Sequence, residues 1–375
     1  MKITAIRTTP LYCQFKQPYH WSQGINYGAP VILVEVETDA GIVGIAESVA
    51  SPDIEPVSAI IDFAIPFFVG ESAYDGARLI AKVYQAGFNA RGTGSAPRYF
   101  AQAISGIELA LWDAIGKAAK QPIHRLLGGA VHDKIYYFAF VQGDTPDQLA
   151  AHSTQLVKDG FSVIYVKVGR GMELDLAIVK SVREAIGDKR LRLDANEAWD
   201  MLMARTMFHK LEPFDIEFIE QPVPARAGSA ALAKLRASTS IPIAADQTVY
   251  GPDDVYDICR SDAADVITLG MHETGGIQRY RKAAAVAEAA GLNVCVHGVF
   301  ETGITTCATN QVAATIPNMD DGNQIMWQLL EHDIVKSPDL VPVDGALPIS
   351  GLPGLGFEID RDAVESAAQA FRKQR

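Results

Sequence analysis

Six residues recur at nearly equal spacing in the second half of the chain. They are Lys167, Asp194, Glu220, Asp246, Gly270 and His297, separated by 27, 26, 26, 24 and 27 positions. All lie at or near the ends of short apolar runs, such as VIYVKV around Lys167. A lysine inside an apolar strand is costly unless its amine has a partner or a task. The pattern therefore indicates one polar site assembled from several strands.

The three carboxylates of this series predict a metal site. A single acidic residue at a strand end is most often a helix cap or a solvated loop residue, but matched spacing on three successive strands disfavours that explanation for the set. Carboxylates held close together repel one another unless a cation lies between them. Oxygen-only ligands suit a hard ion, so we expect Asp194, Glu220 and Asp246 to bind Mg²⁺. The four cysteines lack CxxC spacing, so neither zinc nor a disulfide framework is expected.

Lys167 and His297 are the candidate proton carriers. Each has a simpler explanation: a lysine whose stem is buried while its amine reaches water, and a hydrogen-bonded core histidine. Beside a metal and partly desolvated, however, the neutral amine is favoured, which is the form that a base needs. Five strand positions separate the two residues, which predicts that they lie on opposite faces of a bound substrate. That arrangement suits removal of the proton α to a metal-held carboxylate, formation of a metal-stabilised enediolate, and proton delivery to the other face.

Repeated units of this length predict a (β/α) barrel. From about residue 134 a short apolar strand alternates with an amphipathic segment, and repeated βα units imply a parallel sheet. Near-equal units that close on themselves form a barrel whose active site lies at the carboxyl ends of its strands. An open doubly wound sheet is the rival architecture, but the chain has no GxGxxG or GxxxxGK phosphate turn. Strand alternation places Tyr165 on the face of Lys167, and Asn196 on the face of Asp194.

The first part of the chain predicts a separate α+β unit. The run VILVEVETDAGIVGIAES reads as two strands joined by a turn at residues 39–41, and helical stretches follow from about residue 60 to 119. The formal charge of −12 argues against nucleic acid and anionic membranes as partners. Because no window approaches 18 unbroken apolar residues and the first residues lack a signal-peptide core, we expect a cytoplasmic protein.

Taken together, these residues resemble the enolase superfamily, in its mandelate racemase/muconate lactonizing enzyme branch. The likeness spans nearly the whole chain and rests on LDANEAW, FIEQPVP, IPIAADQT, ETGGI and GLPGLGFEID, in this order and spacing. It implies a modified TIM barrel, residues 126–339, and an α+β capping domain, residues 1–125, completed by the C-terminal tail, residues 340–375. It assigns the three carboxylates to Mg²⁺, and it suggests a symmetric homo-oligomer.

The resemblance also implies that loops of the capping domain close over the barrel and select the substrate. These would be residues 18–30 and 47–56. The substrate-binding candidates are Tyr19, His20, Trp21 and Tyr27 from the first loop, and Asn196, Gln247, Glu301 and Gln324 from the barrel. Each of the four capping residues could equally be a packing or an exposed residue.

Two positions depart from the family pattern. Relatives often carry Lys-x-Lys on the second strand, whereas this chain has Tyr165 and Lys167, so that a hydroxyl replaces one fixed charge. On the sixth strand, muconate lactonizing relatives carry a lysine and mandelate racemase relatives an aspartate where Gly270 stands. His297 thus lacks its usual partner. His272 and Glu273 follow the strand end, and we assign neither of them that role; the glycine instead leaves room for a larger substrate group.

The sequence therefore predicts a Mg²⁺-dependent enzyme acting on a small carboxylic acid. Lys167 abstracts the α-proton, His297 acts on the opposite face, and Tyr165 assists. Dehydration of a hydroxylated, sugar-acid-like substrate is favoured, with racemisation or epimerisation of a hydroxy acid or amino acid derivative, or cycloisomerisation of the muconate lactonizing type, as alternatives. A metal-dependent hydrolase is disfavoured because no HxH-like cluster is present. A non-catalytic barrel that binds a small acid stays open.

Overall fold

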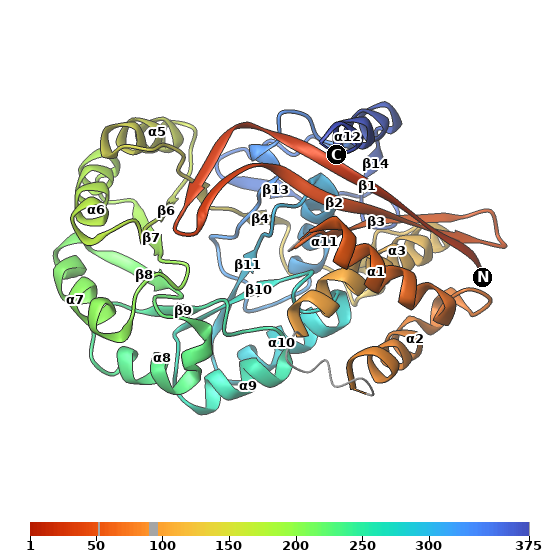
Figure 1. Ribbon diagram of the computed structural model, residues 1–375, viewed down its shortest axis with the longest axis horizontal. Coiled ribbons are helices and arrows are strands. Elements are labelled where there is room, and N and C mark those ends of the chain that lie inside the picture. Colours follow the sequence, from red (N-terminus) through yellow and green to blue (C-terminus); the bar gives the residue numbers. More distant parts are fainter. Residues whose placement is uncertain (52, 90–96, 375) are drawn as a thin grey trace.

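The capping domain of this computed structural model, which describes residues 1–51, 53–89 and 97–374, is built on an antiparallel sheet of order β1-β2-β3 (Figure 1). Its strands are β1 (Ile3–Trp21), β2 (Gly24–Thr38) and β3 (Val43–Val49). β2 and β3 form the predicted hairpin, with Val31 opposite Val49. The helices are α1 (Ile54–Ala64), α2 (Gly76–Val83), a π-helix (Tyr84–Asn89), α3 (Pro97–Ala119) and α4 (Ile123–Leu126).

Helix α3 lies against this sheet at unusually close range. A Cβ atom at Gly44 would stand 2.0 Å from the Ala110 carbonyl oxygen, so glycine is needed for the approach. This close contact fixes β3, and with it the side chains that β3 presents to the barrel.

The barrel contains a seven-stranded parallel sheet of order β11-β10-β9-β8-β7-β6-β5, which confirms the predicted (β/α) architecture. The strands are β5 (Ala139–Phe140), β6 (Val163–Lys167), β7 (Arg190–Asp194), β8 (Ile216–Glu220), β9 (Ile243–Ala245), β10 (Val266–Gly270) and β11 (Asn293–His297). The helices that follow them are α5 (Pro146–Lys158), α6 (Met172–Ile186), α7 (Met201–Leu211), α8 (Ser229–Arg236), α9 (Pro252–Arg260), α10 (Ile277–Ala289) and α11 (Gly303–Ala313). In Figure 1 these helices surround the curled sheet on its outer side.

The barrel interior is closed by Arg192, two residues before Asp194 on β7 and on the same face. Its side chain is fully buried and donates to Glu217 at 2.8 Å, to Asp320 at 2.6 Å and to the Gly322 carbonyl at 2.5 Å. A buried guanidinium is stable only when it is fully paired, and this network supplies its partners. The network closes the barrel at the end opposite the carboxyl ends of the strands.

The C-terminal tail returns to the capping domain. Helix α12 (Arg361–Lys373) begins at the N-cap Asp360 and packs against β1. The short strands β12 (Val335–Ser337) and β14 (Glu358–Ile359) pair with each other, and β13 (Ala346–Pro348) pairs with β4 (Lys134–Tyr136). Among the described residues no helix has the length and apolar character needed to cross a membrane.

The segment at residues 18–30 differs from the expected irregular loop. It is the distal end of a long β-hairpin, in which Tyr19 pairs with Asn26 and Trp21 with Gly24. The hairpin extends from the capping domain across the barrel towards β6 (Figure 1). Backbone pairing resumes at Tyr19 after a register shift that follows Gln14, and it makes an extended hairpin, rather than a loop, the favoured conformation here.

Candidate active site

Strand register brings the predicted residues to one edge of the sheet. Lys167 lies opposite Asp194, and Asp194 opposite Glu220. Glu220 pairs with Ala244, two residues before Asp246. On the other side of the sheet, Gly270 lies opposite His297.

The carboxylates of Asp194, Glu220 and Asp246 are almost completely buried. The Tyr165 hydroxyl donates to Asp194 Oδ2 at 2.6 Å and to Glu220 Oε2 at 3.1 Å, and its ring is stacked on Phe138. Burial, and then the negative charges of Asp194 and Asp246, raise the pKa of Glu220 well above its usual value. Glu220 Oε1 and Asp246 Oδ2 have no hydrogen-bond partner in the described part of the chain. Buried acceptors without donors, in a set of mutually repelling carboxylates, fit a hard divalent cation.

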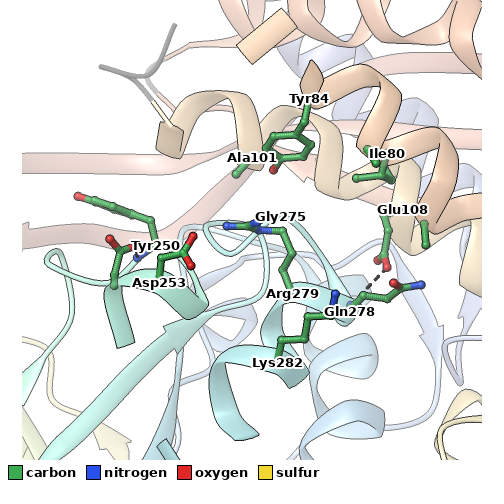
Figure 2. Close-up of a pocket in the computed structure, with 13 residues that line it drawn as sticks. Ile80, Tyr84, Ala101, Glu108, Tyr250, Asp253, Gly275, Gln278, Arg279 and Lys282 are labelled. Carbon is green, nitrogen blue, oxygen red and sulfur yellow. Dashed lines mark hydrogen bonds between the residues drawn. The ribbon is translucent and has the colours of Figure 1, made fainter. Parts of the chain in front are cut away.

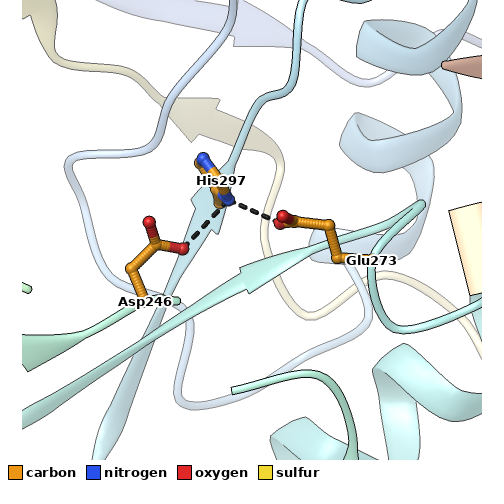
Figure 3. Close-up of side chains that lie close together, drawn as sticks. All are labelled: Asp246, Glu273 and His297. Carbon is orange, nitrogen blue, oxygen red and sulfur yellow. Dashed lines mark hydrogen bonds and ion pairs between the residues drawn. The ribbon is translucent and has the colours of Figure 1, made fainter. Parts of the chain in front are cut away.

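A second cluster shares Asp246 with this set. Within the described part of the chain, it is the ligand atoms of Asp246, Glu273 and His297 that all lie within 4.8 Å of one another (Figure 3). However, His297 Nδ1 is 2.6 Å from Glu273 Oε2 and 3.0 Å from Asp246 Oδ1, so these atoms already satisfy one another. Glu220 Oε1 and Asp246 Oδ2 lack donors among the described residues, so we assign the metal to the carboxylate set of Asp194, Glu220 and Asp246.

Lys167 is hydrogen-bonded to two side chains at the end of the neighbouring strand. Its Nζ donates to Asp194 Oδ2 at 2.5 Å and to Asn196 Oδ1 at 2.6 Å. Burial is the largest single influence and lowers the pKa of Lys167, but Asp194, Tyr19 and Glu220 together outweigh it and raise the pKa above its ordinary value. This direction is opposite to the predicted neutral amine, because neighbouring negative groups favour the charged form of the amine.

The sixth-strand position differs from the sequence interpretation. A Cβ atom at Gly270 would lie 2.2 Å from Glu273 Oε2, so the carboxylate of Glu273 fills the space that was assigned to a larger substrate group. Glu273 is thus the close partner of His297. His272 is not, because its ring nitrogens bond the hydroxyls of Ser105 and Thr305, each at 2.7 Å.

Two of the four capping residues reach the site edge. Tyr19 is buried, with its ring against those of Phe140 and Phe300 and its hydroxyl close enough to the Lys167 amine for that amine to influence its pKa, which burial raises to about 12. Trp21 packs edge-on against Phe300. The adjoining hairpin turn touches the loop after β7, since Ser22 Oγ lies 3.4 Å from the Asn196 carbonyl oxygen.

The other two capping residues point elsewhere. His20 Nδ1 lies 3.7 Å from the Asp144 carboxylate, and the Tyr27 side chain is 60% exposed. The structure does not bring either of them to the carboxylate set, and their substrate contacts stay predictions.

The polar barrel candidates are buried beside the site. Gln247 Oε1 has no partner among the described residues, whereas Gln324 Oε1 accepts from the Gly298 N–H at 3.3 Å. Burial, and then the charge of Glu47, raise the pKa of Glu301 to about 8. Its carboxyl is therefore protonated in a large fraction of molecules near neutral pH and able to donate a hydrogen bond.

A pocket of about 500 Å³ lies at a different place, between α2 and α3 of the capping domain and α9 and α10 of the barrel (Figure 2). Arg279 lies at its centre and donates to the Thr274 carbonyl at 2.8 Å. Glu108 accepts from the Ile277 N–H at the start of α10 at 2.9 Å. None of the predicted site residues lines this pocket, and these contacts make it a junction between capping domain and barrel.

Comparison with known proteins agrees with this geometry. The family model "Mandelate racemase / muconate lactonizing enzyme, N-terminal domain" matches residues 2–128, and the model "Enolase C-terminal domain-like" matches residues 148–363. The chain belongs to the enolase superfamily, in its mandelate racemase/muconate lactonizing enzyme branch.

Its superfamily relatives catalyse several reactions. A chloromuconate cycloisomerase of Cupriavidus pinatubonensis is 32% identical over 90% of this chain and 91% of the relative. A D-xylonate dehydratase of Haloferax volcanii is 33% identical over 91% of this chain and 85% of the relative. A dipeptide epimerase of Cytophaga hutchinsonii, solved with Mg and D-Ala-L-Val, superposes with a TM-score of 0.90 at 26% identity and 98% coverage of both chains. Similarity to these proteins thus identifies the superfamily of this chain but not the reaction that it catalyses.

Three contributors to this superfamily site were missed from the sequence. Gln221 Oε1 accepts from the Asp246 N–H at 3.1 Å and so holds the loop that carries this ligand. Phe140 and Phe300 enclose Tyr19. Gln221 directly follows Glu220 in the FIEQPVP motif, which is a local signal that could have identified it, whereas the two phenylalanines meet Tyr19 only through docking of the capping domain.

Proposed function

We propose that the protein dehydrates a hydroxylated, sugar-acid-like carboxylic acid in the presence of Mg²⁺. This proposal rests on one observation: a candidate proton carrier lies on each side of the carboxylate set. Lys167 contacts Asp194 at one side, and His297 contacts Asp246 at the other. A carboxylic acid held at the set would have one of these groups on each side of its α-carbon.

Mg²⁺ held by Asp194, Glu220 and Asp246 would bind the substrate carboxylate and stabilise the negative charge that develops on it. Lys167, neutral when substrate is bound, takes the α-proton. The bond between Cβ and its hydroxyl then breaks, His297 gives its proton to the leaving oxygen, and water departs. The remaining enol becomes a 2-keto-3-deoxy acid.

The surroundings of the site support a hydroxylated substrate. Gln247 Oε1 is a buried acceptor with no donor in the part of the chain that the structure describes, and the protonated Glu301 carboxyl can donate. Substrate hydroxyls can satisfy both groups, because a hydroxyl donates and accepts. An entirely apolar substrate would leave the Gln247 acceptor unsatisfied, at a cost of about 1–3 kcal/mol.

Proton NMR in D₂O with Mg²⁺ tests this function across a panel of aldonic acids, aldaric acids, hydroxy acids and N-acyl amino acids. Formation of a 2-keto-3-deoxy acid supports dehydration. Loss of the α-proton signal with inverted configuration would instead assign epimerisation, and a lactone product from a diene diacid would assign cycloisomerisation.

Two variants examine the proton carriers. Lys167→Met should lose α-proton removal, by about 10²–10⁴-fold, while Mg²⁺ binding measured by calorimetry persists. His297→Asn should lose water elimination while slow exchange of the α-proton by Lys167 continues. Exchange that survives in Lys167→Met would remove this residue as the base.

A further inference from the structure

Glu273 lies where it can hold the orientation of the His297 imidazole ring. Its Oε2 atom is 2.6 Å from His297 Nδ1, and the side chains of His297 and Glu273 are only 10% and 4% exposed (Figure 3). When Glu273 is ionised its carboxylate can only accept, so that Nδ1 carries the hydrogen of this bond. The other ring nitrogen, Nε2, is left for the substrate.

The chain segment after β10 explains how a residue three positions beyond the strand reaches back. The Thr274 N–H donates to the Gly270 carbonyl at 3.0 Å, and the Gly276 N–H donates to the Met271 carbonyl at 2.9 Å. These bonds close a tight turn, and Gly276 adopts a φ of +108° that side chains rarely allow. The turn brings Glu273 back over the strand end.

Gly270 leaves the space that this carboxylate occupies. The residue lies directly opposite His297 in the parallel pair β10–β11. A Cβ atom built at position 270 would stand 2.2 Å from Glu273 Oε2 and 3.0 Å from its Cδ, closer than such atoms approach. Any side chain at 270 would therefore push the carboxylate away from the imidazole.

We propose that Glu273 is the positioning residue of His297, and that glycine at position 270 is the structural condition for this contact. Asp246 also approaches Nδ1, at 3.0 Å, but it belongs to the carboxylate set that would hold Mg²⁺. Glu273 makes the shorter contact and has no place in that set. The role of His297 in turnover rests on the proposed function; the contact itself does not.

The first test needs no substrate. With histidine labelled by ¹⁵N and Mg²⁺ present, the hydrogen on His297 Nδ1 should give a downfield, slowly exchanging proton resonance, assigned by its loss in His297→Asn. It should disappear in Glu273→Ala and in Gly270→Ala, and persist in Glu288→Gln, a control on the exposed face of α10. An unchanged resonance in Glu273→Ala would overturn the proposal, whatever the protein catalyses.

The second test uses turnover of the acid found in the NMR panel. Glu273→Gln should lower kcat by at least about 100-fold with KM changed by less than about threefold, because the histidine is misplaced while substrate binding is intact. α-Proton exchange by Lys167 and Mg²⁺ affinity should stay near wild type. A parallel fall of all three quantities would show a structural role and refute positioning.

Relocating the carboxylate supplies the rescue. In Gly270→Asp combined with Glu273→Ala, the new carboxylate at position 270 occupies the space of the removed Glu273 side chain. The kcat of this double variant should be at least tenfold higher than that of Glu273→Ala alone. If wild-type protein acts on no acid in the panel while the Nδ1 resonance behaves as expected, the proposed function fails and the Glu273 contact stands.

Discussion

Glu47 couples the capping domain to the barrel, and its burial makes that coupling dependent on pH. From β3 it accepts from the N–H groups of Thr302 and Thr305 at 3.0 and 3.1 Å, and from their hydroxyls at 2.9 and 2.6 Å. Both threonines lie at the start of α11, directly after the loop that follows His297. Burial raises the pKa of Glu47 from 4.5 to about 7, although the threonine bonds oppose the shift.

The sign of the effect follows from proton linkage. Between pH 4.5 and pH 7 the folded protein holds a proton on Glu47 that the unfolded chain has released, so this group stabilises the fold at low pH and the contribution is lost as the pH rises through 7. At about 1.36 kcal/mol per pKa unit, the free energy of unfolding loses about 2 kcal/mol between pH 5.5 and pH 8.5. Glu47→Gln removes this titration.

The expected result is a difference that changes with pH. Urea denaturation followed by circular dichroism, at pH 5.5 and pH 8.5, should show the free energy of unfolding of Glu47→Gln rising by at least about 2 kcal/mol relative to wild type, because the variant also removes the charge that raises the pKa of Glu301. Glu108, whose pKa burial also raises to about 7, is present in both proteins and cancels. Glu288→Gln should show no such trend. A pH-independent difference for Glu47→Gln, or one of opposite sign, would refute the reasoning.

Three further outcomes are expected. Mg²⁺ at 100 times its dissociation constant should raise the free energy of unfolding by about 2.7 kcal/mol, and Asp246→Asn should reduce this gain; an equal gain in both proteins, measured by urea denaturation, would place the ion elsewhere. Arg192→Met should cost about 3–5 kcal/mol in the same assay, because Glu217 and Asp320 lose their buried counter-charge; a loss below about 1 kcal/mol would contradict the sealing role. Tyr19→Phe should lower kcat/KM about tenfold, through loss of one hydroxyl beside Lys167, at unchanged stability; steady-state kinetics that match wild type would remove Tyr19 from the site.

The architecture and the positions of the main site residues could be predicted from the amino-acid sequence. A period of 24 to 27 residues fixes one strand and one helix per unit, and strand alternation fixes which side chains face inward. Since parallel strands end at a common edge, residues at successive strand ends must meet, as the pairing of Lys167, Asp194 and Glu220 shows. These properties depend on local patterns, which a sequence displays directly.

The neighbours of those residues could not be predicted from the sequence and became visible in the folded structure. The partner of His297 is Glu273, whose carboxylate fills the space above Gly270, because a turn of backbone hydrogen bonds brings it back. The bonds from Glu47 to α11 join positions more than 250 residues apart. Such contacts depend on how a turn closes and on how two domains dock. Both are set by packing over the whole molecule, and no local periodicity records them.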